Sequence, residues 1–407
     1  MIDATEIQRP RLRPVEARPL GDGQAGKFAV HDPTGLSEAV LTVSEPALFI
    51  LSLLDGRHTL DEVSAKFELR YRQPVREETL RGLIGNLDGA QLLDGPAFTA
   101  YVERLRSAYR SARVRPSVFG TRLGSTDEVR SMFDEMIPQD GWSRPAGVIV
   151  VGLITPHLDY PRGGPCYGHG YSALRGRTCP KRVVIVGTNH FGRSMSVVAT
   201  AKPFETVLGE TAVDAAFLDG VEARCGVSLR AEEMDHRREH SVELQLMILQ
   251  HLFGAESFTI VPFLCADPCG PTGTKPLDGD GIDLREFVVA LRETIRSAEG
   301  DTLVIAGADM SHVGSQFGDA FRLEPAFLSG VEERDRRALS FLETMRPDAF
   351  LVSVADGHNP TRVCSAGCMF VAASVLWDAR PELLHYHQAF DEETQVCVSC
   401  AALVYTR

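Results

Sequence analysis

Two apolar segments that each end in a histidine restrict most strongly how this chain can fold. GVIVVGLITPH ends at His157, and RVVIVGTNH ends at His190. Both segments are rich in Val and Ile and lack polar alternation, which predicts strands buried on both faces of a sheet. Residues just beyond the strand ends line the binding crevice of an open α/β sheet. We therefore expect both imidazoles to lie in a functional site at this edge.

Strands and helices alternate from residue 115 to residue 407. Segments with helical spacing of apolar residues lie at 284–298 and 370–379, among others. The strand-like segments are 148–155, 183–188, 258–264 and 302–308. This alternation predicts an α/β sheet with covering helices.

The first hundred residues have a different pattern. Thr59 stands three residues before Glu62, which predicts a capping box at the start of a helix. A second helix is predicted where Leu80, Leu83, Ile84 and Leu87 recur at helical spacing. Short helices with flanking strands predict a small winged-helix-like α+β domain. We expect domains over residues 1–100 and 115–407, joined by a basic linker helix over 101–114.

Charge and hydropathy exclude some partners. The formal net charge of −13 argues against nucleic-acid binding, which needs a basic face. The apolar segment LFILSLL is too short to span a bilayer, and the first residues lack the apolar core of a signal peptide. We expect a cytoplasmic protein without a membrane partner.

His240 stands at the entrance of an apolar segment that predicts a helix. Glu243 lies about one turn further on, where its carboxylate could orient the imidazole of His240. His236 and Glu239 precede the apolar segment, so we expect both to be more exposed.

Asp309 and His312 follow the predicted strand 302–308, in what reads as a polar loop. A carboxylate and an imidazole there could bind metal, transfer protons or hold substrate. We expect Asp309 and Glu243 to support metal ligands rather than to bind the metal.

Cys364 lies where a loop enters an apolar helix, and a helix N-terminus favours the thiolate, the form that binds metals. Cys397 and Cys400 form a CxxC within a predicted strand, where they point to opposite faces and make a poor zinc pair. We assign structural roles to Cys265, Cys269, Cys397 and Cys400, and Cys368 would point toward the core one turn after Cys364.

The C-terminal part of the chain carries an ordered set of motifs: TPHLDYPRGGP, GTNHFG, REHSVELQL, GADMSHVG and TRVCSAG. The set resembles the Memo family, also called AmmeMemoRadiSam system protein B, which is similar in fold to class III extradiol dioxygenases. Family members place iron on two histidines and a cysteine. By motif, the resemblance implies metal ligands at His157, His190 and Cys364. It also implies that the site is lined by His240, Asp309 and His312.

The segment from LFILSLLDG to AQLLDG resembles PqqD-like domains, which bind peptide leaders. The resemblance implies that a peptide or protein substrate adds as a strand beside AVLTVS, with the helix over Leu80 to Leu87 as the other wall of the groove. A radical-SAM or other peptide-modifying enzyme is the implied class of partner.

The predicted function is that of a mononuclear non-haem iron oxidoreductase with Fe(II) as cofactor, and with copper or zinc as alternatives. His240 is the expected general acid/base, and Asp309 and His312 are expected to position substrate or donate protons. Two other functions remain open: a non-catalytic scaffold that binds a peptide or protein, and a zinc-dependent hydrolase.

Overall fold

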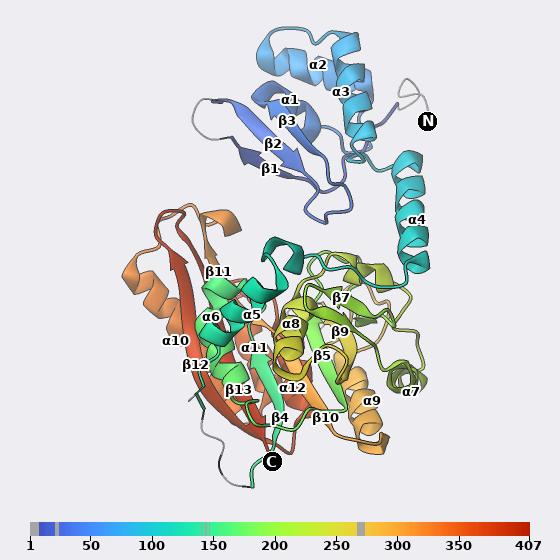
Figure 1. Cartoon of the computed structure of the whole chain (residues 1–407). Coiled ribbons are helices and arrows are strands. Elements are labelled where there is room, and N and C mark those ends of the chain that lie inside the picture. The colour runs from blue at the N-terminus through green and yellow to red at the C-terminus, as the bar shows by residue number, and fades with distance from the viewer. Residues whose placement is uncertain (1–7, 21–23, 140, 143–144, 146, 267–272) are drawn as a thin grey trace. The chain divides into compact units, whose positions relative to one another are not determined.

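The chain divides into two compact units, an N-terminal unit (Met1–Ala112) and a C-terminal unit (Arg113–Arg407) (Figure 1). The structure is a computed structural model that describes residues 8–20, 24–139, 141–142, 145, 147–266 and 273–407. Cys269 lies outside the described residues.

The described residues of the N-terminal unit form a small antiparallel sheet and four helices. The sheet has the order β1 (Glu16–Pro19), β2 (Lys27–His31), β3 (Val40–Ser44). The helices are α1 (Glu45–Ser52), α2 (Leu60–Tyr71), α3 (Glu77–Gly89) and α4 (Pro96–Ser111). The predicted capping box of α2 is confirmed, because the Thr59 side chain accepts from the backbone N–H of Glu62 and the Glu62 carboxylate accepts from that of Thr59.

The core of the N-terminal unit lies between the sheet and the helices. Leu80, Ile84 and Leu87 of α3 are buried in it together with Val30 and Val43. These three α3 side chains therefore face the core and are not free to line a groove, and the helix that packs on β3 is α1.

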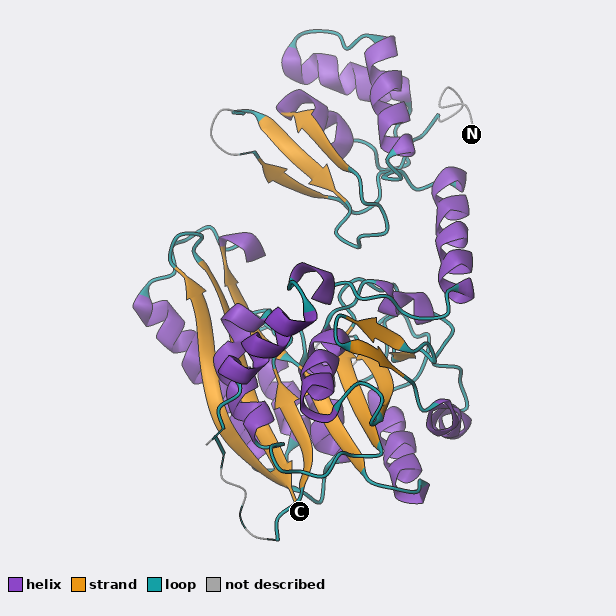
Figure 2. Ribbon diagram, viewed as in Figure 1, coloured by secondary structure: helices purple, strands orange, loops and turns teal. Residues whose placement is uncertain are grey.

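The C-terminal unit is built on an eight-stranded mixed sheet with the order β11-β13-β4-β10-β5-β9-β6, in which β12 pairs with β13 (Figure 2). The four central strands β4, β10, β5 and β9 are parallel, so their carboxyl ends lie at one edge. The strands of this sheet are β4 (Val150–Thr155), β5 (Arg182–Thr188), β6 (Val198–Ala199), β9 (Thr259–Cys265), β10 (Thr302–Gly307), β11 (Asp309–Gly314), β12 (Arg380–Asp391) and β13 (Val396–Thr406). A separate hairpin pairs β7 (Phe204–Thr206) with β8 (Gly209–Thr211).

Helices cover both faces of this sheet. They are α5 (Thr126–Met136), α6 (Tyr160–Ser172), α7 (Ala215–Cys225), α8 (Ser241–Phe253), α9 (Leu284–Ser297), α10 (Pro325–Glu343), α11 (Pro347–Ala355) and α12 (Ala366–Val375), with short 3₁₀ turns at Gly120–Arg122, Glu233–Arg237 and Ser315–Phe317. Alternate residues of β5 enter opposite cores: Val184 packs toward α9 and α12, and Val183 packs toward α8. The prediction of strands buried on both faces is confirmed. Among the described helices, none is long and apolar enough to cross a bilayer.

The segment of Asp309 and His312 is a strand, so the predicted polar loop is wrong. It forms β11, which pairs antiparallel with β13 and has an irregular register between these two residues. The distant strand β13 supplies the backbone partners, and no local pattern reveals that pairing. On β13, Cys397 and Cys400 pack into different clusters, which confirms that they face opposite sides.

Candidate metal centre

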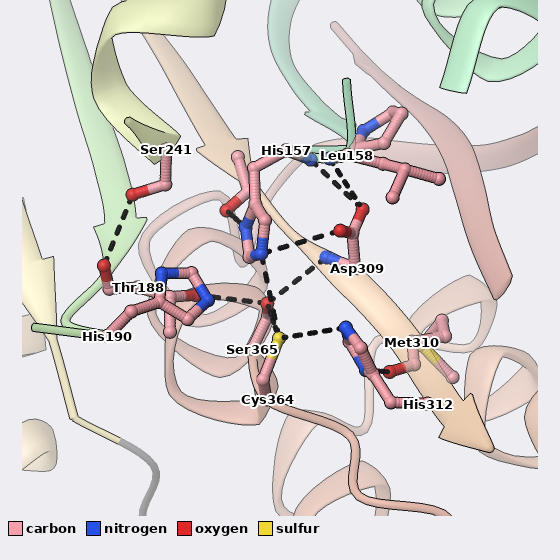
Figure 3. A network of polar contacts seen from close by, with 12 residues as sticks. His157, Leu158, Thr188, His190, Ser241, Asp309, Met310, His312, Cys364 and Ser365 are labelled. Carbon is pink, nitrogen blue, oxygen red and sulfur yellow. Dashed lines mark hydrogen bonds and ion pairs between the residues drawn. The ribbon is translucent and has the colours of Figure 1, made fainter. Parts of the chain in front are cut away.

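Polar residues from several elements meet at the carboxyl edge of the parallel strands. His157 follows β4, His190 follows β5, and Cys364 precedes α12. Because β4, β10 and β5 are parallel neighbours, the residues after them lie side by side. Figure 3 shows the side chains of His157, His190, His312 and Cys364 pointing toward one another.

His157, His190 and Cys364 form a candidate metal-ligand set. Each offers one ligand atom, and the three atoms lie within 4.8 Å of one another. The Cys364 Sγ is 3.6 Å from Nε2 of His157. The two imidazole planes are nearly perpendicular, at 88°, with ring centroids 4.7 Å apart. The rings therefore approach a common point from different directions.

The tautomer of His157 is fixed by the backbone. Its Nδ1 lies 2.9 Å from the carbonyl oxygen of Gly307, which can only accept, so Nδ1 carries a proton and Nε2, which faces Cys364, is the nitrogen that can bind a metal when His157 is neutral. The Asp309 carboxylate accepts from the backbone N–H groups of His157 and Leu158, and its other oxygen lies 3.4 Å from Nε2 of His157. Burial opposes a charge on His157, but Asp309 and the Cys364 sulfur outweigh it and raise the pKa of His157 to about 9.

Glu239 holds His190 in a similar way. Nδ1 of His190 lies 3.1 Å from the Glu239 carboxylate, which also accepts from the backbone N–H groups of His190, His240 and Ser241. The expectation that Glu239 is exposed is wrong, since it is 1% exposed. It is buried because four hydrogen-bond donors replace its hydration. Burial alone would raise the pKa of Glu239, but the neighbouring His190 outweighs this effect and holds the pKa well below the usual value.

Cys364 carries the features of a thiolate. Burial alone would raise the pKa of this thiol, but His312 and His157 outweigh it and hold the pKa well below the usual value. Nε2 of His312 lies 4.0 Å from the sulfur, and Nδ1 of His312 faces the carbonyl oxygens of Met310 and Arg362. His312 therefore also presents its unprotonated nitrogen to the site when it is neutral.

His240 lies at the N-cap position of α8, as the sequence predicts, and its ring stacks on that of His190 at a centroid distance of 5.2 Å. The ring of Phe119 also stacks on that of His240, at a centroid distance of 6.3 Å. Burial lowers the pKa of His240 to about 4. His190, Glu239 and His240 also form a second grouping of metal-ligand type.

Glu243 does not orient His240, contrary to expectation. Its buried carboxylate pairs with the guanidinium of Arg115 and accepts from the Ser117 hydroxyl and from the backbone N–H groups of residues 118–120. The i, i+3 spacing places the side chains of His240 and Glu243 about one turn apart. Residues 115–120, however, bind the Glu243 carboxylate in place of His240. His236, also expected to be exposed, is 1% exposed.

A cavity of about 630 Å³ opens onto this centre. His190 and Cys364 lie in its wall beside the apolar side chains of Met195 and Leu277 and the polar side chain of Asn359. A ligand in this cavity would lie beside two of the three candidate metal ligands.

Sequence reasoning missed two polar residues behind Cys364. The Ser365 hydroxyl lies 3.2 Å from the Cys364 sulfur, 3.0 Å from the Thr188 hydroxyl, and accepts from the backbone N–H of Asp309. Cys368 is buried beside Thr188, in keeping with its predicted core role. For Glu239, the available signal was its place directly before His240 at the entrance of α8.

Comparison with known proteins gives consistent matches. A family model described as Memo-like protein matches residues 124–404. A MEMO1 family protein of Aquifex aeolicus is 24% identical over 98% of this chain and 100% of its own length, so its similarity extends over both units. A MEMO1 family protein of Methanopyrus kandleri is 29% identical over 63% of this chain and 83% of its own. Another, of Thermotoga neapolitana, is 33% identical over 46% of this chain and 63% of its own.

Proposed function

Since this chain belongs to the Memo-like protein family, we propose that its C-terminal unit is a mononuclear non-haem metal oxidoreductase that holds Fe(II) through His157, His190 and Cys364. The observation that carries the proposal is the convergence of two imidazoles and one thiolate within 4.8 Å.

The donor set fits such an ion in three respects. Both histidines donate Nδ1–H to a fixed acceptor, the Gly307 carbonyl and the Glu239 carboxylate, which orients Nε2 as a ligand. Cys364 is poised as a thiolate without a metal. Two imidazoles and one thiolate leave coordination positions open, and they also suit copper or zinc.

The bound iron would supply redox chemistry and a site for dioxygen or substrate. His240 stacks on His190 and is largely neutral near pH 7, so its imidazole can accept a proton from a substrate bound beside His190. The Asp309 carboxylate lies 3.4 Å from Nε2 of His157, and Nε2 of His312 lies 4.0 Å from the Cys364 sulfur, so both residues can orient substrate or return a proton.

Metal analysis of the full chain, purified without oxygen, tests the proposal. We expect about one iron per chain, lost in Cys364→Ser and retained in Cys179→Ser, which changes a half-buried cysteine outside the centre. Dioxygen consumption should follow the iron content. His240→Ala should keep the iron but lower consumption. Zinc in place of iron would favour the hydrolase, and absence of any bound metal would favour the binding scaffold.

We also propose that the N-terminal unit is a PqqD-like, winged-helix-type domain that recruits a peptide or protein substrate, together with a peptide-modifying enzyme such as a radical-SAM enzyme. What supports this is a sheet whose strand β3 lies at an edge, with Val40 62% exposed. An edge strand can pair with an added peptide through its backbone.

Binding of peptides encoded beside this gene to the full chain tests that role. Val40→Lys should weaken binding, because a lysine on an edge strand opposes strand addition. Val352→Lys, on a valine of α11 that is 71% exposed, is the matched control. Equal binding by both variants would contradict the role of β3.

A further inference from the structure

Three histidines that are not part of the proposed iron centre come together on the C-terminal unit. His385 and His387 lie on β12, and His169 lies in the last turn of α6. The rings of His169 and His385 stack with centroids 4.5 Å apart, and those of His385 and His387 lie 6.4 Å apart at 19°.

The fold directs all three side chains to one side of the sheet. Opposite His385 and His387 on the neighbouring strand β13 stand Ala402 and Cys400. Both of these β13 residues pack against Cys166 of α6. The His-x-His pair of β12 therefore faces α6, since alternate residues of a strand share a face.

We propose that His169, His385 and His387 form a second metal site, which takes a divalent transition ion of the zinc, nickel or copper type. Three imidazoles with an open fourth position are an established zinc ligand set, and imidazole also suits copper and nickel. The ligand nitrogens of these three residues do not all lie within 4.8 Å of one another in this arrangement, so binding of a common ion requires rotation of the side chains about χ1 and χ2.

The surroundings keep these imidazoles in the form that binds metal. Partial burial and neighbouring His169 lower the pKa of His385, and partial burial lowers that of His387. His169 is exposed at the surface, so an ion can reach the cluster directly. The proposal does not depend on the oxidoreductase function.

Zinc titration of the full chain in a Cys364→Ser/His190→Ala background separates this site from the proposed iron centre, because His190 belongs to both ligand groupings of that centre. We expect one zinc equivalent to remain bound in that background. His385→Gln and His169→Gln should each weaken it by more than about tenfold, since each removes one of three ligands. His58→Gln, on a histidine of the N-terminal unit, should leave it unchanged, and circular dichroism checks the fold of each variant.

Copper(II) gives an independent readout. In the same Cys364→Ser/His190→Ala background, its electron paramagnetic resonance spectrum should show coupling to more than one imidazole nitrogen, and this coupling should be reduced in His387→Gln. Unchanged zinc affinity in His385→Gln and His169→Gln, or no zinc bound in the Cys364→Ser/His190→Ala background, would overturn the proposal.

Discussion

The α8 side and the β11 side of the centre each place a buried carboxylate against a histidine, but the carboxylates meet different nitrogens. On the α8 side, Glu239 contacts Nδ1 of His190, behind the ring. On the β11 side, Asp309 lies 3.4 Å from Nε2 of His157, the nitrogen that faces Cys364. The first arrangement orients a ligand, whereas the second brings a carboxylate within reach of whatever the centre binds.

Asp309→Asn should have the largest effect on turnover. The amide oxygen can keep the hydrogen bonds from the backbone of His157 and Leu158, but the negative charge beside Nε2 is lost. We expect dioxygen consumption to fall about 10²–10⁴-fold, the usual range for a proton-transfer group, while iron content is retained. Iron loss in this variant would instead make Asp309 a metal ligand and remove the contrast with Glu239.

Arg115→Met tests how strongly the α8 side depends on its buried ion pair. Arg115 and Glu243 are both 0% exposed, and the guanidinium also donates to the carbonyl oxygens of His236 and Glu239. Loss of the cation leaves a buried carboxylate without its counter-ion, which costs about 3–5 kcal/mol. The free energy of unfolding follows from urea denaturation monitored by tryptophan fluorescence, since Trp142 and Trp377 both lie in the C-terminal unit.

Arg113→Met is the matched control for that measurement. Arg113 pairs with Glu210 at the surface, where solvent screens the attraction. The free energy of unfolding of Arg113→Met should stay close to that of the unmodified chain. An equal loss of unfolding free energy in Arg115→Met and Arg113→Met would mean that the buried pair of Arg115 and Glu243 adds no specific stability to the α8 side.

Glu239→Gln should lower metal affinity although the three proposed ligands, His157, His190 and Cys364, remain in place. A carboxylate behind a metal-bound histidine sets its orientation and basicity, and its loss typically costs about 10–100-fold in affinity. Competition with a chelator measures this, with Glu333→Gln on the exposed surface of α10 as control. If Asp309→Asn lowered metal affinity more than Glu239→Gln did, the roles would have to be reversed: Asp309 would orient a metal ligand, and Glu239 would act on what the centre binds.

Local patterns predicted much of this architecture. The apolar runs of β4 and β5 and the capping box of α2 depend on neighbouring residues only, so the sequence shows them. The Memo family resemblance is confirmed by the family match.

The errors concern tertiary contacts that local patterns do not show, most of them with partners distant in sequence. β11 is a strand because β13, some 90 residues later, pairs with it. Glu239 is buried by donors at residues 190, 240 and 241, and Glu243 is held by residues 115–120. A charged residue before an apolar helix is usually solvated, and only the tertiary fold shows which ones have enough donors to be buried.

The smallest expected effect is an acid sensitivity whose sign differs between the two sides. On the α8 side, burial lowers the pKa of His236 to about 3, against about 6.5 in an unfolded chain. Above pH 6.5 His236 is neutral in both states. As the pH falls below 6.5 the unfolded chain binds a proton that the folded chain does not, so stability falls by up to about 1.4 kcal/mol per pH unit.

On the β11 side, burial raises the pKa of Asp335, although Ser311, Ser399 and Tyr386 donate to it. The folded chain then binds a proton more readily than the unfolded chain, so this group adds stability as the pH falls and loses it as the pH rises. His236→Gln should therefore flatten the decline in unfolding free energy between pH 6.5 and 5, whereas Asp335→Asn should leave that decline in place or steepen it. Parallel slopes for His236→Gln and the unmodified chain would show that His236 is not the residue that makes the α8 side sensitive to acid.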